Sequence, residues 1–201
     1  MDTFILFIMN DDNKNTGGFI PTHGGYRNLF SYQKSEIIYD GTVYFTNRFF
    51  NKYDRTIGQM VQAARSGKQN IAEASMASAT SKETEIKLTN VARASLEELL
   101  IDYEDFLRTK KLPIWDKEHK LVARLRELNK STPTPTYETF VKAIEHESPE
   151  ICANTMITLI KICTYLLKQQ LKQLEIAFVK EGGLRERMTK ARIDERNKKN
   201  K

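Results

Sequence analysis

The sequence predicts an all-α protein that folds as an antiparallel up-down-up-down four-helix bundle, with an insertion between helices three and four and a basic C-terminal tail. Apolar residues recur at three- and four-residue spacing over four long segments, and no segment shows the two-residue alternation of a half-buried strand. The links between the first three segments are short, whereas the link before the fourth is long. A chain of 201 residues is also long enough to bury one core.

The domain organisation follows from shifts in composition. Residues 1–25 are expected to form a flexible leader, because their second part is polar and rich in glycine around Pro21. The bundle is expected over residues 26–182, with residues 113–148 as the insertion. Residues 183–201 form the basic tail, which has a helical pattern of its own.

Helices one and two are predicted from about Leu29 to Phe50 and from Asp54, a favoured N-cap residue, to about Ser78. Gly41 lies inside helix one, where glycine costs about 1 kcal/mol relative to alanine. We therefore expect another helix to approach closely at this position. The second half of helix two is rich in alanine, serine and glycine, and this predicts a tightly packed inner element.

Helix three is predicted to begin at a capping box formed by Thr80 and Glu83 and to end near Lys110. It carries several carboxylates that lie mostly off its apolar stripe. We expect these acids to be solvated and to pair with Arg93 or Arg108 at helical spacing. The acids are Glu97, Glu98, Asp102, Glu104 and Asp105.

Helix four is predicted to start at Ser148 and Pro149 and to end at Gly182 and Gly183. Its N-terminal half carries a second apolar stripe, which exceeds what one bundle seam requires. Either the insertion or another subunit should cover this surplus. Within the insertion, Trp115 precedes a short helical pattern that consists of Leu121, Leu125 and Leu128. A turn-rich stretch follows this pattern.

No recognisable catalytic, metal or cofactor motif is present in the sequence. Cys152 and Cys163 are eleven residues apart, lack CxxC spacing, and lie in an apolar helical stretch, so we expect them to be buried packing residues. The three histidines form no ligand pair, the glycine pairs match no phosphate-binding loop, and no serine lies in a GxSxG motif. The sequence therefore predicts a non-enzymatic protein without a metal or cofactor.

Membrane insertion is not predicted. The longest uninterrupted apolar run, Phe4 to Met9, has six residues, compared with the roughly 20 that a membrane-spanning helix needs. A secretory signal peptide is also not expected, since the N-terminal segment opens with Asp2 and runs into Asp11 and Asp12. With two unpaired cysteines, these features predict a cytoplasmic protein.

The net charge of +6 is concentrated at the C-terminus. Residues 180–201 contain nine basic and four acidic side chains, a balance of +5, so the other 179 residues are close to neutral at +1. Clusters of lysine and arginine attract phosphate backbones through charge and counterion release. A solvated helix end or a free arm is the alternative explanation of such a composition. The predicted nucleic-acid contacts are Arg185, Arg187, Lys190, Arg192, Arg196, Lys198 and Lys199 in the tail, with Arg65 and Lys68 on helix two as a weaker addition.

Several short motifs resemble a known family: Tyr26-Arg27-Asn28-Leu29 with Ser31-Tyr32-Gln33-Lys34, then Gln69-Asn70-Ile71-Ala72-Glu73, then Ala92-Arg93-Ala94-Ser95-Leu96-Glu97-Glu98-Leu99. They are similar to the bacterial four-helix-bundle family that includes the protein encoded in intervening sequences of large-subunit ribosomal RNA and the accessory variability determinant of diversity-generating retroelements. The resemblance spans residues 26–110. Residues 153–157 and 181–188 resemble the suffix-domain branch and extend the likeness to about residue 192.

The resemblance implies a basic homopentamer that associates with a reverse transcriptase and binds nucleic acid. Typical members carry paired arginines before the double alanine of helix two and a proline after it, where this chain has Val61, Gln62 and Lys68. The tail is therefore the better candidate for nucleic-acid contact. The leading hypothesis is a non-enzymatic, self-associating bundle that binds RNA or DNA phosphates without sequence specificity. The alternative is an adaptor that binds a protein through the spare apolar face of helix four, with no nucleic-acid role.

Overall fold

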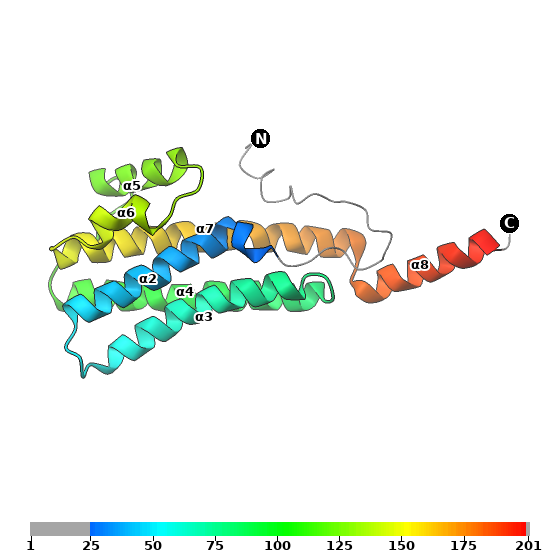
Figure 1. Cartoon of the computed structure of the whole chain (residues 1–201), viewed down its shortest axis with the longest axis horizontal. Helices are drawn as coiled ribbons and strands as arrows, with labels where there is room; N and C mark the ends of the chain where they lie inside the picture. The colour runs from blue at the N-terminus through cyan, green and yellow to red at the C-terminus, as the bar shows by residue number, and fades with distance from the viewer. Residues whose placement is uncertain (1–24, 200–201) are drawn as a thin grey trace.

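The computed structural model describes residues 25–199, and within this range the protein is all-helical, without strands. The prediction of an all-α protein is confirmed. In Figure 1 the long helices lie side by side, short helices lie above one end of them, and the last helix projects from the other end. A 3-10 turn, η1 (Tyr26–Asn28), precedes the α-helices, which are α2 (Phe30–Phe49), α3 (Arg55–Ala77), α4 (Lys82–Thr109), α5 (Lys120–Ser131), α6 (Tyr137–Ile144), α7 (Pro149–Glu181) and α8 (Leu184–Lys199).

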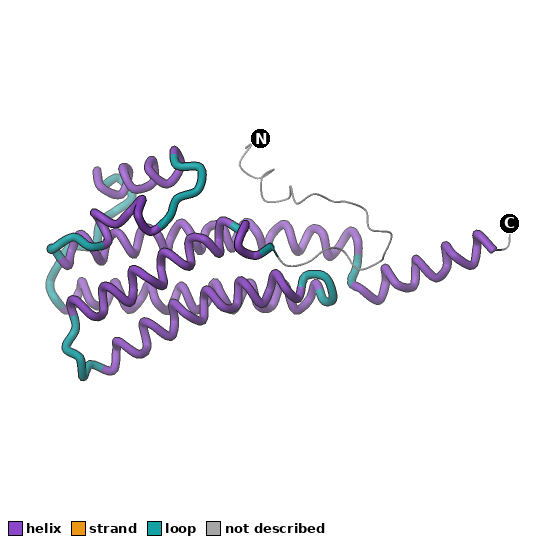
Figure 2. The backbone as a smooth tube through the Cα atoms, in the orientation of Figure 1, coloured by secondary structure: helices purple, strands orange, loops and turns teal. Residues whose placement is uncertain are grey.

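The core lies between α2, α3, α4 and α7. Helix α2 packs against α3 and α7, and α4 packs against the same two helices on the other side. Figure 2 shows that loops join these helices only at their ends. An aromatic cluster fills one part of the core: the ring centroid of Phe45 lies 4.8 Å from those of both Tyr103 and Phe106. The buried Tyr103 hydroxyl donates a hydrogen bond to Thr42 Oγ1 at 3.1 Å, so this polar group is satisfied inside the core.

Local chemistry fixes the starts of α3 and α4. Asp54 caps α3 as predicted, since its carboxylate accepts a hydrogen bond from the Thr56 amide at 2.9 Å. The predicted capping box of Thr80 and Glu83 is wrong. Ser81 caps α4 instead and accepts from the Thr84 amide at 3.1 Å. The chain is still turning out of α3 at residue 80, where the Thr80 amide donates to the Ala77 carbonyl, so the cap falls one residue later.

Two glycines mark close approaches between helices. A Cβ atom at Gly41 would lie 2.7 Å from the sulfur of Met156 on α7, which confirms the expected approach at this position. A Cβ atom at Gly67 would lie 2.8 Å from the Leu96 side chain on α4. The predicted tight packing of helix two is therefore present in α3, which presents small side chains to α4.

Helix α7 has the bounds that the sequence predicts. Pro149 is its first residue, and Gly182 ends it with a φ of +69°, a conformation that favours glycine. Every residue from Cys152 to Ile160 is buried, because α2 and α4 pack on this part of α7 and α5 and α6 of the insertion cover it further. Helix α6 contacts α2 as well as α7. Of the two expected covers for the surplus apolar surface of its N-terminal half, the insertion is the one present. This half of α7 is therefore not the spare apolar face that the adaptor hypothesis used.

The stretch from Pro149 to Lys199 contains a window that is long and apolar enough to cross a membrane, with a mean hydropathy of 1.3. The length of uninterrupted apolar runs does not indicate this window, because polar residues are interspersed in it. Within the protein, 72 % of this window is buried. Most of its residues therefore pack inside the protein. The run from Phe4 to Met9 lies outside the described residues.

The insertion contains one helix that the sequence predicts and one that it does not. The pattern at Leu121, Leu125 and Leu128 corresponds to α5. Helix α6 was missed, although its apolar residues follow helical spacing from Tyr137 to Ile144 and the Thr136 amide donates to the Thr139 hydroxyl at its start. Its eight residues are too few for periodicity alone to distinguish them from a turn that follows two prolines.

Candidate functional site

The basic residues of the tail lie on α8, which projects beyond the end of α7 (Figure 1). The Gly183 amide donates to the Glu186 carboxylate at 2.9 Å where the new helix starts. Six of the seven predicted tail contacts are exposed, and Arg187 is half-buried. The tail is thus a solvent-exposed helix rather than part of the packed core.

The geometry of α8 divides its cations into two groups. At about 3.6 residues per turn, Arg185, Arg192 and Arg196 fall within a narrow sector on one side of the helix. No carboxylate of α8 lies in this sector. Lys199 lies at its edge and forms an ion pair with Glu195 at 3.7 Å. The three arginines therefore form a basic stripe with no ion-pair partner among the described residues, and we call it the arginine stripe.

The other predicted contacts are not part of this stripe. Lys190 and Lys198 point to other sides of α8, and Arg187 lies nearly opposite. The Nε and Nη2 atoms of Arg187 are buried and lack a hydrogen-bond partner among the described residues. These cations contribute to the general positive field of α8, but they do not share one surface with the arginine stripe.

Arg65 and Lys68 lie on a different element, in the middle of α3. The Lys68 ammonium lies 4.2 Å from the centre of the Tyr39 ring. Burial raises the pKa of the neighbouring Asp40 carboxyl, and the positive charge of Lys68 offsets part of this rise. Lys68 is thus engaged within the protein. Arg65 is exposed. Since α8 points away from α3 in Figure 1, the structure does not bring the two predicted basic regions together.

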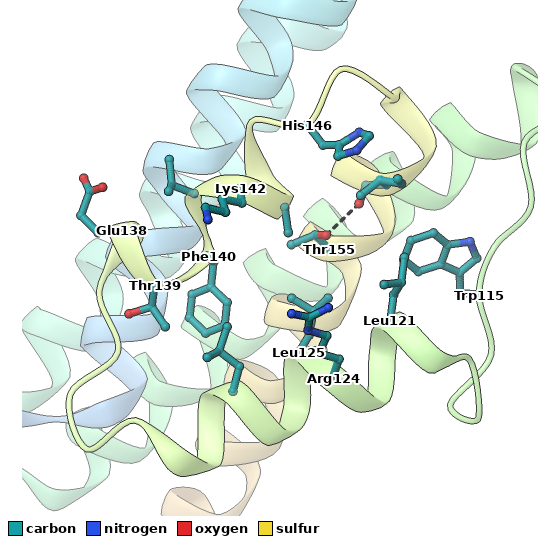
Figure 3. Close-up of a pocket in the computed structure, with 14 residues that line it drawn as sticks. Trp115, Leu121, Arg124, Leu125, Glu138, Thr139, Phe140, Lys142, His146 and Thr155 are labelled. Atoms are coloured by element: carbon teal, nitrogen blue, oxygen red, sulfur yellow. Dashed lines mark hydrogen bonds between the residues drawn. The ribbon is translucent and has the colours of Figure 1, made fainter.

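A cleft of about 530 Å³ lies between α5, α6 and the first turns of α7 (Figure 3). Its size falls in the range of ligand pockets, about 300–1,000 Å³. Side chains that include Leu125, Phe140 and Ile151 make its lining mostly apolar. Arg124 and Lys142 add positive charge to the lining. The sequence did not indicate this cleft, because it depends on α6 and on how the insertion folds back onto α7.

The Trp115 segment forms one wall of the cleft and is held on α7 by specific bonds. The Trp115 amide donates to Asn154 Oδ1 at 2.8 Å, and the Asn154 amide nitrogen donates to the Pro113 carbonyl at 3.0 Å. The indole nitrogen of Trp115 donates to the Glu150 carboxylate at 2.8 Å. The indole also stacks on the His119 ring, with centroids 4.1 Å apart. This wall is therefore pre-formed by the buried Asn154.

The cysteine thiols are buried, as predicted, and are poor nucleophiles. Burial raises the pKa of both Cys152 and Cys163 to about 12, so both remain protonated near neutral pH. Among residues 25–199, no group of three or more histidine, cysteine or acidic side chains could hold a metal ion. Two of the five helix-three acids pair as expected: Asp105 lies 2.8 Å from Arg108, and Glu97 lies 4.0 Å from Arg93. Glu104 pairs with Lys161 on α7 instead, at 3.5 Å, and Asp102 is half-buried.

Lys34 on α2 is a buried cation that the sequence did not single out. Only 3 % of this residue is exposed, and its ammonium has no hydrogen-bond partner among the described residues. The nitrogen lies 5.1 Å from the centre of the Phe140 ring. Burial lowers the pKa of Lys34 to about 8, and this effect is only partly offset by Cys163. Lys34 is not among the residues that line the cleft.

Comparison with known proteins identified no matching family model, no similar curated protein and no similar solved structure. The resemblance to the bacterial four-helix-bundle family therefore stays a prediction from short motifs.

Proposed function

We propose that this chain is a non-enzymatic, self-associating protein that binds nucleic-acid phosphates without sequence specificity through α8. We further propose that α2, α3, α4 and α7 constitute an antiparallel up-down-up-down four-helix bundle, because short links join the first three and each helix packs against two of the others. The protein would act in the cytoplasm.

The observation that supports this function best is the arginine stripe. Arg185, Arg192 and Arg196 have no ion-pair partner among the described residues, and they stand on a helix that projects from a nearly neutral body. Arginine binds phosphate through several donors in a fixed planar arrangement, which makes it well suited to contacts with a nucleic-acid backbone. Such contacts depend on the phosphate charge rather than on the base sequence of the nucleic acid, so binding should be non-specific.

Self-association is supported by the outer side of α4. Val91 and Ile101 are 45 % and 58 % exposed, and Ala94 lies between them on the same side of the helix. These exposed apolar side chains, with the exposed Glu98 among them, suit a contact with a second copy of the chain. The homopentamer and the association with a reverse transcriptase rest on the family resemblance alone. Equilibrium sedimentation would test the oligomer, and a monomeric mass would overturn it.

A salt-dependent binding titration tests the nucleic-acid function. The variant R185Q/R192Q/R196Q should weaken binding and reduce the slope of log affinity against log salt by about 2 on single strands. The matched control K180Q/K190Q/K198Q removes the same charge away from the stripe and should have a smaller effect. An affinity that does not depend on salt, or that is unchanged by deletion of residues 184–201, would contradict the proposal.

The insertion cleft favours a second candidate function, that of a protein-interaction adaptor. Leu121 and Leu128, which are 37 % and 36 % exposed, line the cleft beside the Trp115 wall and could receive an apolar side chain of a partner. This role predicts that L121E/L128E abolishes recovery of a protein partner while R185Q/R192Q/R196Q leaves it intact. Sedimentation with and without nucleic acid separates the two functions.

A further inference from the structure

A second basic surface lies on α7, within the body of the protein. Lys161, Tyr165, Lys168 and Lys172 are separated by four, three and four residues, so they line one side of the helix. All four are exposed. They form one wall of a groove of about 880 Å³, whose other wall is α4. We call this the α4/α7 groove.

The cations of the groove differ in how they are paired. Arg93 on α4 lies 4.0 Å from Glu97, and Lys161 lies 3.5 Å from Glu104 across the groove. Lys168 and Lys172 form no ion pair within residues 25–199. Lys168 and Lys172 are exposed and unpaired, so they are available to a ligand. The exposed ion pairs of Arg93 and Lys161 contribute little to stability, so they would not prevent a ligand from binding in the groove. Their charge is positive, so that ligand should be anionic.

Tyr165 is the feature that specifies the ligand further. It is 61 % exposed, although it lies in the middle of a long packed helix. No hydrogen bond or ring contact to another described residue holds its side chain. An aromatic ring placed between lysines on an exposed helix surface combines a stacking platform with phosphate contacts, which is how sequence-tolerant proteins bind single strands.

We propose that the α4/α7 groove binds single-stranded nucleic acid, with one base stacked on Tyr165 and the backbone phosphates contacted by Lys168 and Lys172. This inference rests on the proposed function and adds to it a second contact surface and a strand preference. In a duplex, the faces of the bases are covered by their neighbours, so the ring of Tyr165 gains a partner only when the strand is unpaired. The groove should therefore favour single strands over duplexes, whereas the arginine stripe should not discriminate between them.

The stacking contact is tested by fluorescence anisotropy with labelled 20-nucleotide oligo(dT) and oligo(U) and with a 20-base-pair duplex. Tyr165→Ala should weaken single-strand binding by roughly 5- to 150-fold and should leave duplex binding nearly unchanged. Tyr165→Phe retains the ring and should bind like the wild type. Tyr53→Ala is the matched control, because Tyr53 is 80 % exposed but lies in the loop before α3.

The phosphate contacts are tested by the salt dependence of the same binding. K168Q/K172Q should reduce the salt slope on single strands by about 1.4, corresponding to two lost phosphate contacts. K117Q/K120Q removes two exposed lysines from the insertion region and should leave the slope close to that of the wild type. Circular dichroism of each variant establishes that the helices are intact.

The outcomes separate this inference from the proposed function. If Tyr165→Ala and K168Q/K172Q bind like the wild type while R185Q/R192Q/R196Q binds weakly, α8 binds nucleic acid and the groove does not. If the wild-type protein binds no nucleic acid, both proposals are overturned. If Tyr165→Ala instead changes the sedimentation mass and leaves affinity unaltered, the groove is an interface between protein chains, and the single-strand proposal is wrong.

Discussion

Replacing Lys34 with methionine should stabilise the protein. Lys34 is 3 % exposed, and its ammonium has no hydrogen-bond partner among the described residues. Methionine has a similar length and shape and can occupy the same space beside the Phe140 ring without a charge. The substitution removes the desolvation penalty of a buried cation while it keeps most of the packing.

The size of the effect follows from the pKa of Lys34. Burial lowers this pKa from 10.5 to about 8, and at 1.36 kcal/mol per pH unit the fall corresponds to about 3 kcal/mol. The penalty applies in full below pH 8, where both states are protonated. Between pH 8 and 10.5 the folded protein releases the proton and the unfolded chain keeps it, so the free energy of unfolding rises with pH in this window.

Urea unfolding of the wild type and Lys34→Met at pH 7 and pH 9 measures this effect. The variant should be more stable by about 3 kcal/mol at pH 7, and its advantage should shrink by about 1 kcal/mol at pH 9. Cys152 and Cys163, whose pKa values are raised to about 12, oppose the wild-type rise above pH 9, because the unfolded thiols ionise first. The contribution of Cys152 cancels between the two proteins. That of Cys163 cancels only in part, because the charge of Lys34 lowers the pKa of this thiol against the larger effect of burial.

The control is Lys87→Met, which removes an exposed lysine from α4 and should show no such pH dependence. An equal stability difference between the wild type and Lys34→Met at pH 7 and pH 9 would refute the argument. It would mean that the ammonium of Lys34 reaches water in the folded protein.

Two further predictions concern packing and the insertion. Gly67→Ala should destabilise the protein by about 1–3 kcal/mol, because the new methyl would lie 2.8 Å from Leu96. Gly58→Ala, with nothing within 4 Å of the new methyl, should stabilise the protein by up to about 1 kcal/mol. Thermal unfolding of both variants would check this pair, and equal shifts in Tm would contradict it. Asn154→Ala should lower the free energy of unfolding by about 1–3 kcal/mol. It should also shift the fluorescence emission of Trp115, the single tryptophan, to longer wavelength. An unchanged spectrum would show that Asn154 does not hold the wall of the cleft.

The long helices could be predicted because their signals are local and repeated. The apolar period, the cap at Asp54 and the break at Gly182 each depend only on neighbouring residues. The cap of α4 was misplaced by one residue, because Thr80 and Ser81 are both good caps and the geometry of the preceding turn decides between them. Helix α6 was missed because it is short and follows prolines.

The candidate sites were less predictable, since they depend on which helices become neighbours. The sequence identified the cations of the tail, and only the helical geometry of α8 separates the arginine stripe from the others. Lys168 and Lys172 gave no signal, because lysines on a long helix are common. They form a site only where α7 and α4 enclose a groove around Tyr165. The buried position of Lys34 likewise depends on α6, whose Phe140 covers it.

The close contact between α3 and α4 restricts which sequences can carry this fold. Ala63, Ala64, Gly67 and Ala74 are all buried on α3. At Gly67 a larger residue would push α4 away, because even a Cβ atom there would lie 2.8 Å from Leu96. The exposed residues between them are free of this restriction. As related sequences diverge, the small residues should therefore persist at these four positions while the outer side of α3 changes. That pattern of spacing would identify distant relatives even after the charges on their surfaces have changed.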